Sequence, residues 1–221
     1  DNMKKILILV SAILFTSASA FAAGNIGISV ANTSFDTSGT ETTKSSGEKN
    51  STTKDEDVII PSLFIEFQTP APFLVGLDIV PVEGELGSGT GSDDDNESSG
   101  ANKASAELAA HVTGYALLPL GSRGAYAKLG VSVAKIDTTE ELATGTSYGN
   151  ENVTGYMIGL GVQKDNSNGS FFRLEATHTD YEDANFKGSF GGNAVGDSAV
   201  RNEVDADVDA TAIRISLGKS F

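Results

Sequence analysis

Six charged side chains lie on the polar face of segments whose residues alternate between apolar and polar, where they could pair with one another. They are three acids and three bases: Glu66, Asp78, Glu175, Lys128, Arg173 and Arg214. An unpaired charge is costly wherever water is excluded, so equal numbers of both signs favour ion pairing. We predict a salt-bridge network in which Arg173 and Arg214, on adjacent strands, lie on either side of Glu175 and reach Glu66.

Carboxylates also cluster in two polar segments, and their oxygens are the ligands that Ca²⁺ prefers. One cluster is the run from Asp93 to Glu97, and the other is the alternating set Glu203, Asp205, Asp207 and Asp209. Neither has the glycine-punctuated spacing of a dedicated calcium loop, so the sequence favours solvated acidic loops and predicts no metal or cofactor site. The alternative is a bridge from Asp207 and Asp209, through divalent cations, to lipid phosphates.

Composition excludes several classes of function. The chain has 30 acidic against 15 basic residues, a formal net charge of −15, and no cysteine. Nucleic-acid binding needs clustered Lys and Arg, so this partner is not expected. Without cysteine, the chain has neither disulfides nor thiolate chemistry.

Eight segments alternate with a period of two, which predicts β-strands with one apolar and one polar face. They are 25–35, 59–68, 73–82, 106–118, 125–136, 153–163, 171–181 and 207–221. Their connections are short turns and long polar stretches by turns, and the long ones are 36–57, 83–105, 137–152 and 182–204. We therefore predict an all-β fold of eight antiparallel up-and-down strands with every short turn at one end.

The fourth segment has the least regular pattern. Its better apolar parity places Leu108 and Val112 on the apolar face and Glu107, His111 and Tyr115 on the polar face. The assignment of this strand to its two faces therefore depends on an unbroken period of two.

The last segment carries its apolar residues at alternate positions and ends on an aromatic residue. The stripe consists of Ile213, Ile215, Leu217 and Phe221. This strand resembles the closing strand of bacterial outer-membrane β-barrels, which the barrel assembly machinery reads as an insertion signal. Residues 23–221 as a whole resemble the small eight-stranded barrels of the OmpA-type transmembrane domain and OmpX kind. The resemblance implies a monomer in the outer membrane, in contact with lipids and lipopolysaccharide, with long extracellular loops and short periplasmic turns.

A soluble eight-stranded barrel of the lipocalin type also alternates, so the direction of each face has to be decided separately. Phe67, Phe73, Phe172 and Phe221 share the apolar parity and lie close to the short turns. A membrane barrel carries an aromatic girdle at this position. We therefore predict that the apolar face contacts lipid and that the charged face lines the lumen.

The beginning of the chain has the pattern of a secretory signal peptide. Lys4 and Lys5 precede an apolar run, and small residues follow up to Ala22. Residues 1–22 are therefore expected to be a signal peptide with a short upstream remnant, and 23–221 the barrel domain.

Three functions follow in order of preference. An eight-stranded lumen is only wide enough for its own side chains, so the charge network is expected to plug it, with Gly76, Gly130, Gly159 and Gly161 leaving room for the long side chains. The preferred function is a structural or surface-interaction role, with the loops meeting a ligand or phage. A narrow channel for ions or very small solutes is the alternative, and a lipid-modifying enzyme comes third.

The enzyme is the weakest hypothesis because the histidines are poorly placed. The deacylases among small barrels use a His and a Ser two residues apart on one face, whereas His178 is followed by Thr179 and Asp180. We expect His178 to be an interfacial polar aromatic and His111 to fill the lumen.

Overall fold

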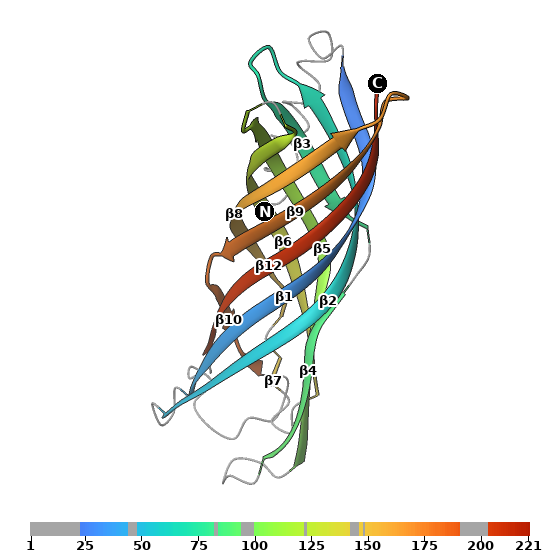
Figure 1. The fold of residues 1–221 in the computed structure, drawn as a ribbon. Coiled ribbons are helices and arrows are strands. Elements are labelled where there is room, and N and C mark those ends of the chain that lie inside the picture. Colours follow the sequence, from blue (N-terminus) through green and yellow to red (C-terminus); the bar gives the residue numbers. More distant parts are fainter. Residues whose placement is uncertain are drawn as a thin grey trace.

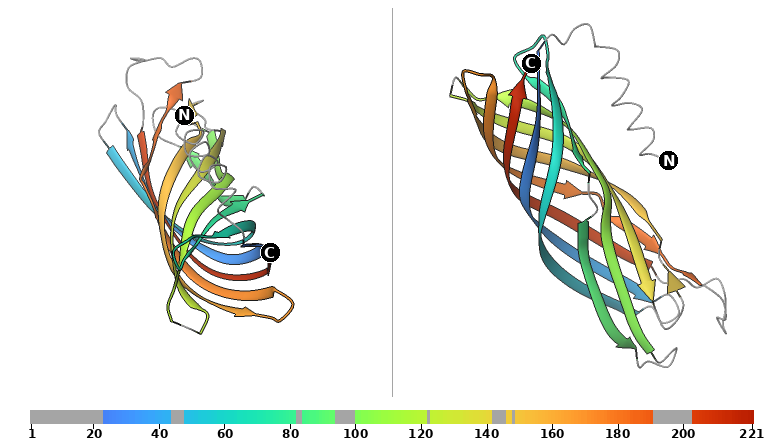
Figure 2. Two further views of the ribbon diagram at one scale, coloured as in Figure 1. Left: turned by 90° about the horizontal axis from the view of Figure 1, so that it is seen from above. Right: turned by 90° about the vertical axis from the view of Figure 1, so that its right-hand side faces the viewer.

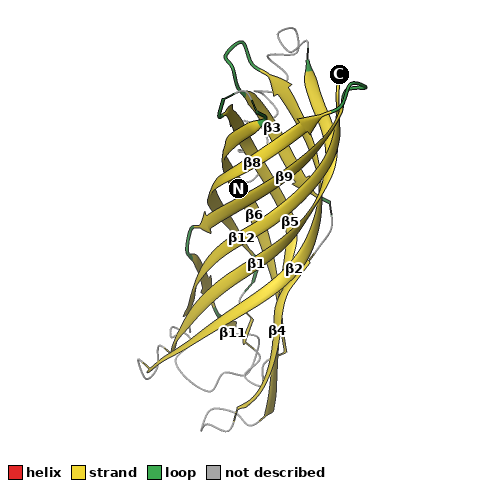
Figure 3. Cartoon of the chain, viewed as in Figure 1, coloured by secondary structure: helices red, strands yellow, loops and turns green. Residues whose placement is uncertain are grey.

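The chain folds entirely into β-structure in the part that can be described. The computed structural model describes residues 23–43, 48–81, 84–93, 100–121, 123–141, 146–147, 149–190 and 203–221. Every regular element in these ranges is a strand (Figure 3). Within the same ranges, no helix is long and apolar enough to cross a membrane. The expected signal segment 1–22 lies outside the described residues.

Eight strands form a closed antiparallel ring (Figure 1). In ring order they are β1 (Gly24–Thr43), β2 (Glu48–Gln68), β3 (Leu74–Val80), β5 (Gly100–Pro119), β6 (Ala125–Glu141), β8 (Glu151–Asp165), β9 (Ser170–Tyr181) and β12 (Glu203–Ser220). The ring closes because β12 pairs with β1 from Asn25–Ser220 to Thr42–Glu203. The predicted fold, an eight-stranded up-and-down barrel, is therefore confirmed, and Figure 2 shows the strands curving around one interior.

Several strands extend well into the stretches predicted as loops. The ladder between β1 and β2 continues without a break to Thr43–Glu48, through most of the stretch 36–57. Likewise β4 (Gly84–Asp93) pairs with β5, β10 (Ala184–Lys187) pairs with β12, and β7 (Thr146–Ser147) pairs with β11 (Ser189–Phe190). The loop prediction was wrong here because polar composition was equated with a lack of structure, whereas backbone pairing between strands needs no apolar side chains.

The short turns are held by backbone hydrogen bonds and, at Gly169, by a left-handed conformation. Gly169 has φ of +81°, the positive value that an Asn-Gly turn requires. Its carbonyl accepts a hydrogen bond of 2.8 Å from the N–H of Ser220. The end of β12 is thus tied to the turn between β8 and β9, and the C-terminal end of the chain lies at this end of the barrel (Figure 1).

In the half of the barrel near the short turns, the apolar face points outward. Ile28, Leu160 and Leu217 are 57, 62 and 58% exposed, and Leu129 and Ile215 are also exposed. Such a belt around a closed ring needs lipid rather than water around it. The prediction that the oily side chains clothe the outside is therefore confirmed.

In the other half, toward the long connections, the polarity of the two faces inverts. Along β12, outward Ile213 gives way to Asp209 and Asp207, while Ala210 points inward. Inward apolar residues from several strands form a core there: Phe35, Leu108, Ala134, Ile136, Val153, Tyr181, Ala184, Phe186 and Ala210. This half is therefore built like a water-soluble barrel, with an apolar interior and an acidic exterior.

A bulge in β5 changes the faces predicted for the start of this strand. The register against β6 shifts between Leu108 and Ala110. One extra residue reverses the faces before it. Leu108 is therefore buried inside and Glu107 is exposed, the opposite of the prediction, whereas Tyr115 points inward as predicted.

The wall of the barrel is hydrogen-bonded all round only in the half near the short turns. The ladder between β2 and β3 ends at Leu63–Ile79. Continued by two residues, the same register would bring Pro61 opposite Pro81, and neither residue has an N–H to donate. The charged side chains described below lie in the sealed half.

Candidate functional site

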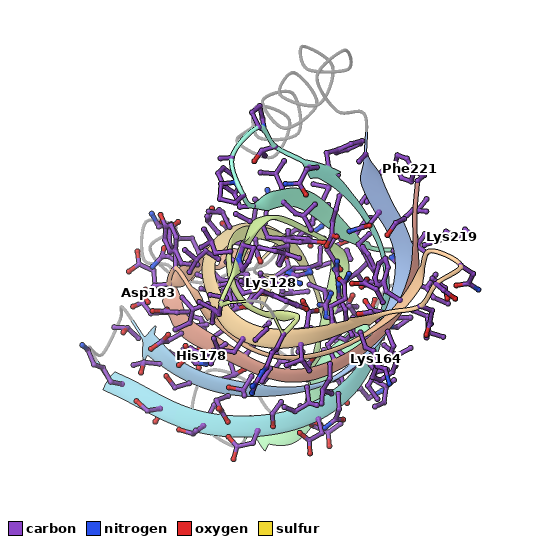
Figure 4. The ribbon with its side chains drawn as sticks, turned by 45° about the horizontal axis from the view of Figure 1, so that its top comes forward. Lys128, Lys164, His178, Asp183, Lys219 and Phe221 are labelled. Atoms are coloured by element: carbon purple, nitrogen blue, oxygen red, sulfur yellow. The ribbon has the colours of Figure 1, made fainter. Side chains whose placement is uncertain are left out.

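All six predicted charged residues line the interior of the barrel and form three ion pairs. The pairs are Arg173 with Glu66, Lys128 with Glu175, and Arg214 with Asp78. Each pair joins one acid to one base, so the lumen carries no net charge from these residues. Figure 4 shows Lys128 inside the ring of strands and Lys219 and Phe221 at its outer edge.

The pair nearest the short turns joins Arg173 on β9 to Glu66 on β2. The guanidinium donates from both terminal nitrogens, at 2.5 and 2.6 Å, and the side chains are only 2 and 0% exposed. Glu66 also accepts hydrogen bonds from Tyr115 Oη at 2.7 Å and Asn25 Nδ2 at 2.9 Å. A carboxylate with this many donors is fully satisfied in its buried position.

Aromatic rings enclose the guanidinium of Arg173. Its central carbon lies 4.6 Å from the ring centroid of Phe171, 5.2 Å from that of Phe64 and 5.7 Å from that of Tyr126. A planar cation among aromatic faces gains cation–π attraction that a water-filled pore would not supply. The pair with its rings therefore forms a dense cross-section of the lumen.

Glu175 has a different partner from the one predicted. Its carboxylate accepts hydrogen bonds from Lys128 Nζ at 3.2 Å and Tyr126 Oη at 2.9 Å. Arg214, directly opposite Glu175 in the register of β9 and β12, turns to Asp78 instead. Arg173 does reach Glu66 as predicted, but the two arginines do not share Glu175.

The third pair, Arg214 with Asp78, is less completely satisfied. Ser62 Oγ donates to Asp78 Oδ2 at 3.0 Å, and Arg214 also contacts Ser62 and Ser29. Among the described residues, Asp78 Oδ1 and Arg214 Nε are buried without a hydrogen-bond partner. Such groups are destabilising in a dry interior, so this is the weakest point of the network.

Aromatic side chains that the sequence analysis did not single out fill the space above the glycines. The ring of Tyr115 lies over Gly76 and that of Tyr126 over Gly161, so an added Cβ at either glycine would meet the ring. Each tyrosine is directly opposite its glycine in the strand register. The glycines thus make room for rings rather than for the long charged chains. A search for inward aromatic residues opposite glycines would have found them.

The two histidines lie on opposite sides of the wall. His111 Nε2 and Tyr181 Oη are 3.0 Å apart inside the lumen, beside a cavity of about 40 Å³. His178 is exposed outside and contacts Thr211 Oγ1 at 3.1 Å. No group of three metal-ligating side chains occurs within the described ranges, which leave out most of the run from Asp93 to Glu97.

Together, the closed ring, the lipid-facing belt and the ion-paired lumen define a transmembrane β-barrel of the outer-membrane class. No family model matches the sequence, and no curated protein matches it either. Solved structures do match it in fold. The outer membrane protein OprG from Pseudomonas aeruginosa is similar over 90% of this chain and 96% of its own, with a TM-score of 0.53 and 17% identity. This likeness shows the fold, and with the apolar belt it places the chain in the outer membrane.

Two further structures are more distant. The outer membrane protein AlkL, solved by solid-state NMR in DMPC bilayers, covers 88% of this chain and 90% of its own at 11% identity and a TM-score of 0.41. Ail, the attachment invasion locus protein of Yersinia pestis, solved with the heparin analogue sucrose octasulfate, covers 86 and 98% at 12% identity and a TM-score of 0.37.

Proposed function

We propose that this barrel is a closed, monomeric outer-membrane protein with a structural or surface-interaction role, its lumen plugged by the ion-pair network. The single observation behind this proposal is the Arg173–Glu66 pair, buried to within 2% and surrounded by aromatic rings. An eight-stranded barrel has no lumen to spare once such groups occupy it. An enzymatic role finds no support in the lumen, where each of the six charges is already paired.

The proposal includes an orientation. The short turns face the periplasm, and the end built like a water-soluble barrel projects from the cell surface. The apolar stripe of Ile213, Ile215, Leu217 and Phe221 is exposed on β12, where the assembly machinery could read it. A surface ligand or phage would then meet the projecting acidic rim, and lipids, including lipopolysaccharide, would meet the belt.

Conductance across planar lipid bilayers tests the plug. The parent barrel is expected to show no resolved current steps, whereas Arg173→Ala, which removes the guanidinium from the cross-section, is expected to show them. Glu66→Gln keeps the shape of the side chain and tests whether the charge is what matters. Lys164→Ala, on the outer surface, is the matched control and should behave like the parent. Equal currents through the parent and Arg173→Ala would contradict the plug.

A narrow channel for ions or very small solutes is the second candidate. The cavity beside Arg214 and the two unsatisfied atoms of the Arg214–Asp78 pair favour it, because both lie at the level where a permeating ion would need room and partners. Resolved current steps in the parent that change in size in Arg214→Ala would support this function over the plug.

A further inference from the structure

A hydrogen bond spans the lumen at the boundary between its charged and apolar halves. It joins His111 on β5 to Tyr181 on β9, strands that are not neighbours in the ring. The two rings meet edge to face, with centroids 6.3 Å apart. Tyr181 belongs to the apolar core on one side, while Arg214 lines the same cavity as both rings on the other.

The charged and titratable groups that face His111 come from three strands. They are Asp78 on β3, Arg214 on β12 and Tyr181 on β9. The neighbouring strands β6 and β8 contribute Ser132 and Met157 to the same cavity, and neither residue titrates. A proton on His111 therefore acts mainly on the pair formed by Asp78 and Arg214.

Neutral and protonated His111 have different needs for hydrogen-bond partners. Tyr181 Oη can donate to Nε2 or accept from it, so it serves both forms of the ring. The protonated ring has a second N–H, which needs an acceptor. Asp78 Oδ1 is buried and has no hydrogen-bond partner in the described part of the chain. Val80 pairs with His111 and Asp78 with Thr113, so Asp78 and His111 are diagonal neighbours on the inward face, within reach of long side chains.

We propose that His111 is a proton-controlled switch of the Arg214–Asp78 ion pair. When His111 takes up a proton, its second N–H binds Asp78 Oδ1, and Asp78 is shared between two cations. Arg214 is then held less firmly, and the positive imidazolium beside it drives it from its place. The lumen loosens at this level in acid and closes again when the proton leaves. The inference rests on the proposed plug, because it describes how the middle of that plug is released.

The second histidine supplies the control. Conductance is recorded at about pH 8 and about pH 4.5, on either side of the range in which histidine ordinarily titrates. Acid is expected to raise the open probability of the parent and of His178→Gln by about tenfold, the effect of a coupling worth about one pH unit. His111→Gln keeps a hydrogen-bonding side chain but cannot become charged, and it should change less than about twofold. An acid response of full size in His111→Gln, or none in the parent, would overturn the switch.

A second measurement does not depend on conduction. In ¹⁵N-histidine spectra of the folded protein in micelles, Asp78→Asn should move the titration midpoint of His111 and leave that of His178 unchanged. No movement of the His111 midpoint would overturn the proposed contact. The plug is judged separately, by whether Arg173→Ala conducts at about pH 8, so either proposal can fail without the other.

Discussion

Two lysine–glutamate pairs in this barrel have nearly the same geometry but opposite burial, and they allow a quantitative test of how the lumen is held together. Lys128 and Glu175 are 3.2 Å apart, with side chains 3 and 2% exposed. Lys103 and Glu141 are 3.3 Å apart, with side chains 62 and 75% exposed. The same substitution, Glu→Gln, can therefore be made in both places with only the surroundings changed.

The expected costs differ widely. Glu175→Gln leaves the ammonium of Lys128 buried without a counter-charge, and breaking a buried pair in this way costs about 3–5 kcal/mol. Glu141→Gln removes an exposed pair, which contributes about 0.2–1 kcal/mol before screening. At about 1 M salt the Debye length falls to about 3 Å, so the small effect should vanish while the large one persists.

Urea unfolding in detergent micelles, followed by far-UV circular dichroism, measures both free energies of unfolding. Replacing both partners by methionine, Lys128→Met with Glu175→Met, should recover most of the loss, because a well-packed apolar pair can replace a buried ion pair. If Glu175→Gln and Glu141→Gln had the same effect, or if salt removed both, the lumen would be wet and the pairs would not form a dry plug.

Two further predictions concern the outer face and the glycines. Ile215→Arg places a charge in the lipid-facing belt and should lower the free energy of unfolding in lipid vesicles by about 2–4 kcal/mol, whereas Asp207→Arg, on the same strand outside the belt, should have little effect; equal losses would place the belt wrongly. Gly161→Ala sets a methyl group against the ring of Tyr126 and should cost about 1–3 kcal/mol in urea unfolding. Gly39→Ala, where the nearest atom to the new Cβ is 4.0 Å away, is its control, and a loss there as large as at Gly161 would argue against the ring contact.

The strands and their faces could be predicted from the sequence because both depend on local alternation. The partners within the lumen could not, because three acids and three bases allow several pairings and the choice depends on tilt and register around the ring. Arg214 shows this well: its directly opposite neighbour is Glu175, yet its guanidinium binds Asp78 on β3. In so narrow a barrel, a long side chain reaches across the axis as easily as along the wall.

The bulge in β5 was beyond prediction for a different reason. An extra residue leaves the composition of the strand unchanged and alters only the count, and Leu108 and Glu107 exchange faces as a result. The pattern of β5 was the least regular of the eight, and that irregularity was the available signal. A pattern that fits neither parity well along its whole length is what a bulge should produce.

The inversion of polarity along the strands locates the edge of the lipid belt. A period of two says that a strand has two faces but not which one meets the interior, and β12 keeps the same period on both sides of Thr211. On one side the outward positions are Ile213 and Ile215, which need lipid, and on the other they are Asp209 and Asp207, which need water. Because backbone pairing with β1 continues through this point, the barrel itself does not end where the lipid does. The bilayer surface must therefore cross β12 near Thr211, so the acidic stretch beyond it stands in water as a continuation of the same wall and not as a loop.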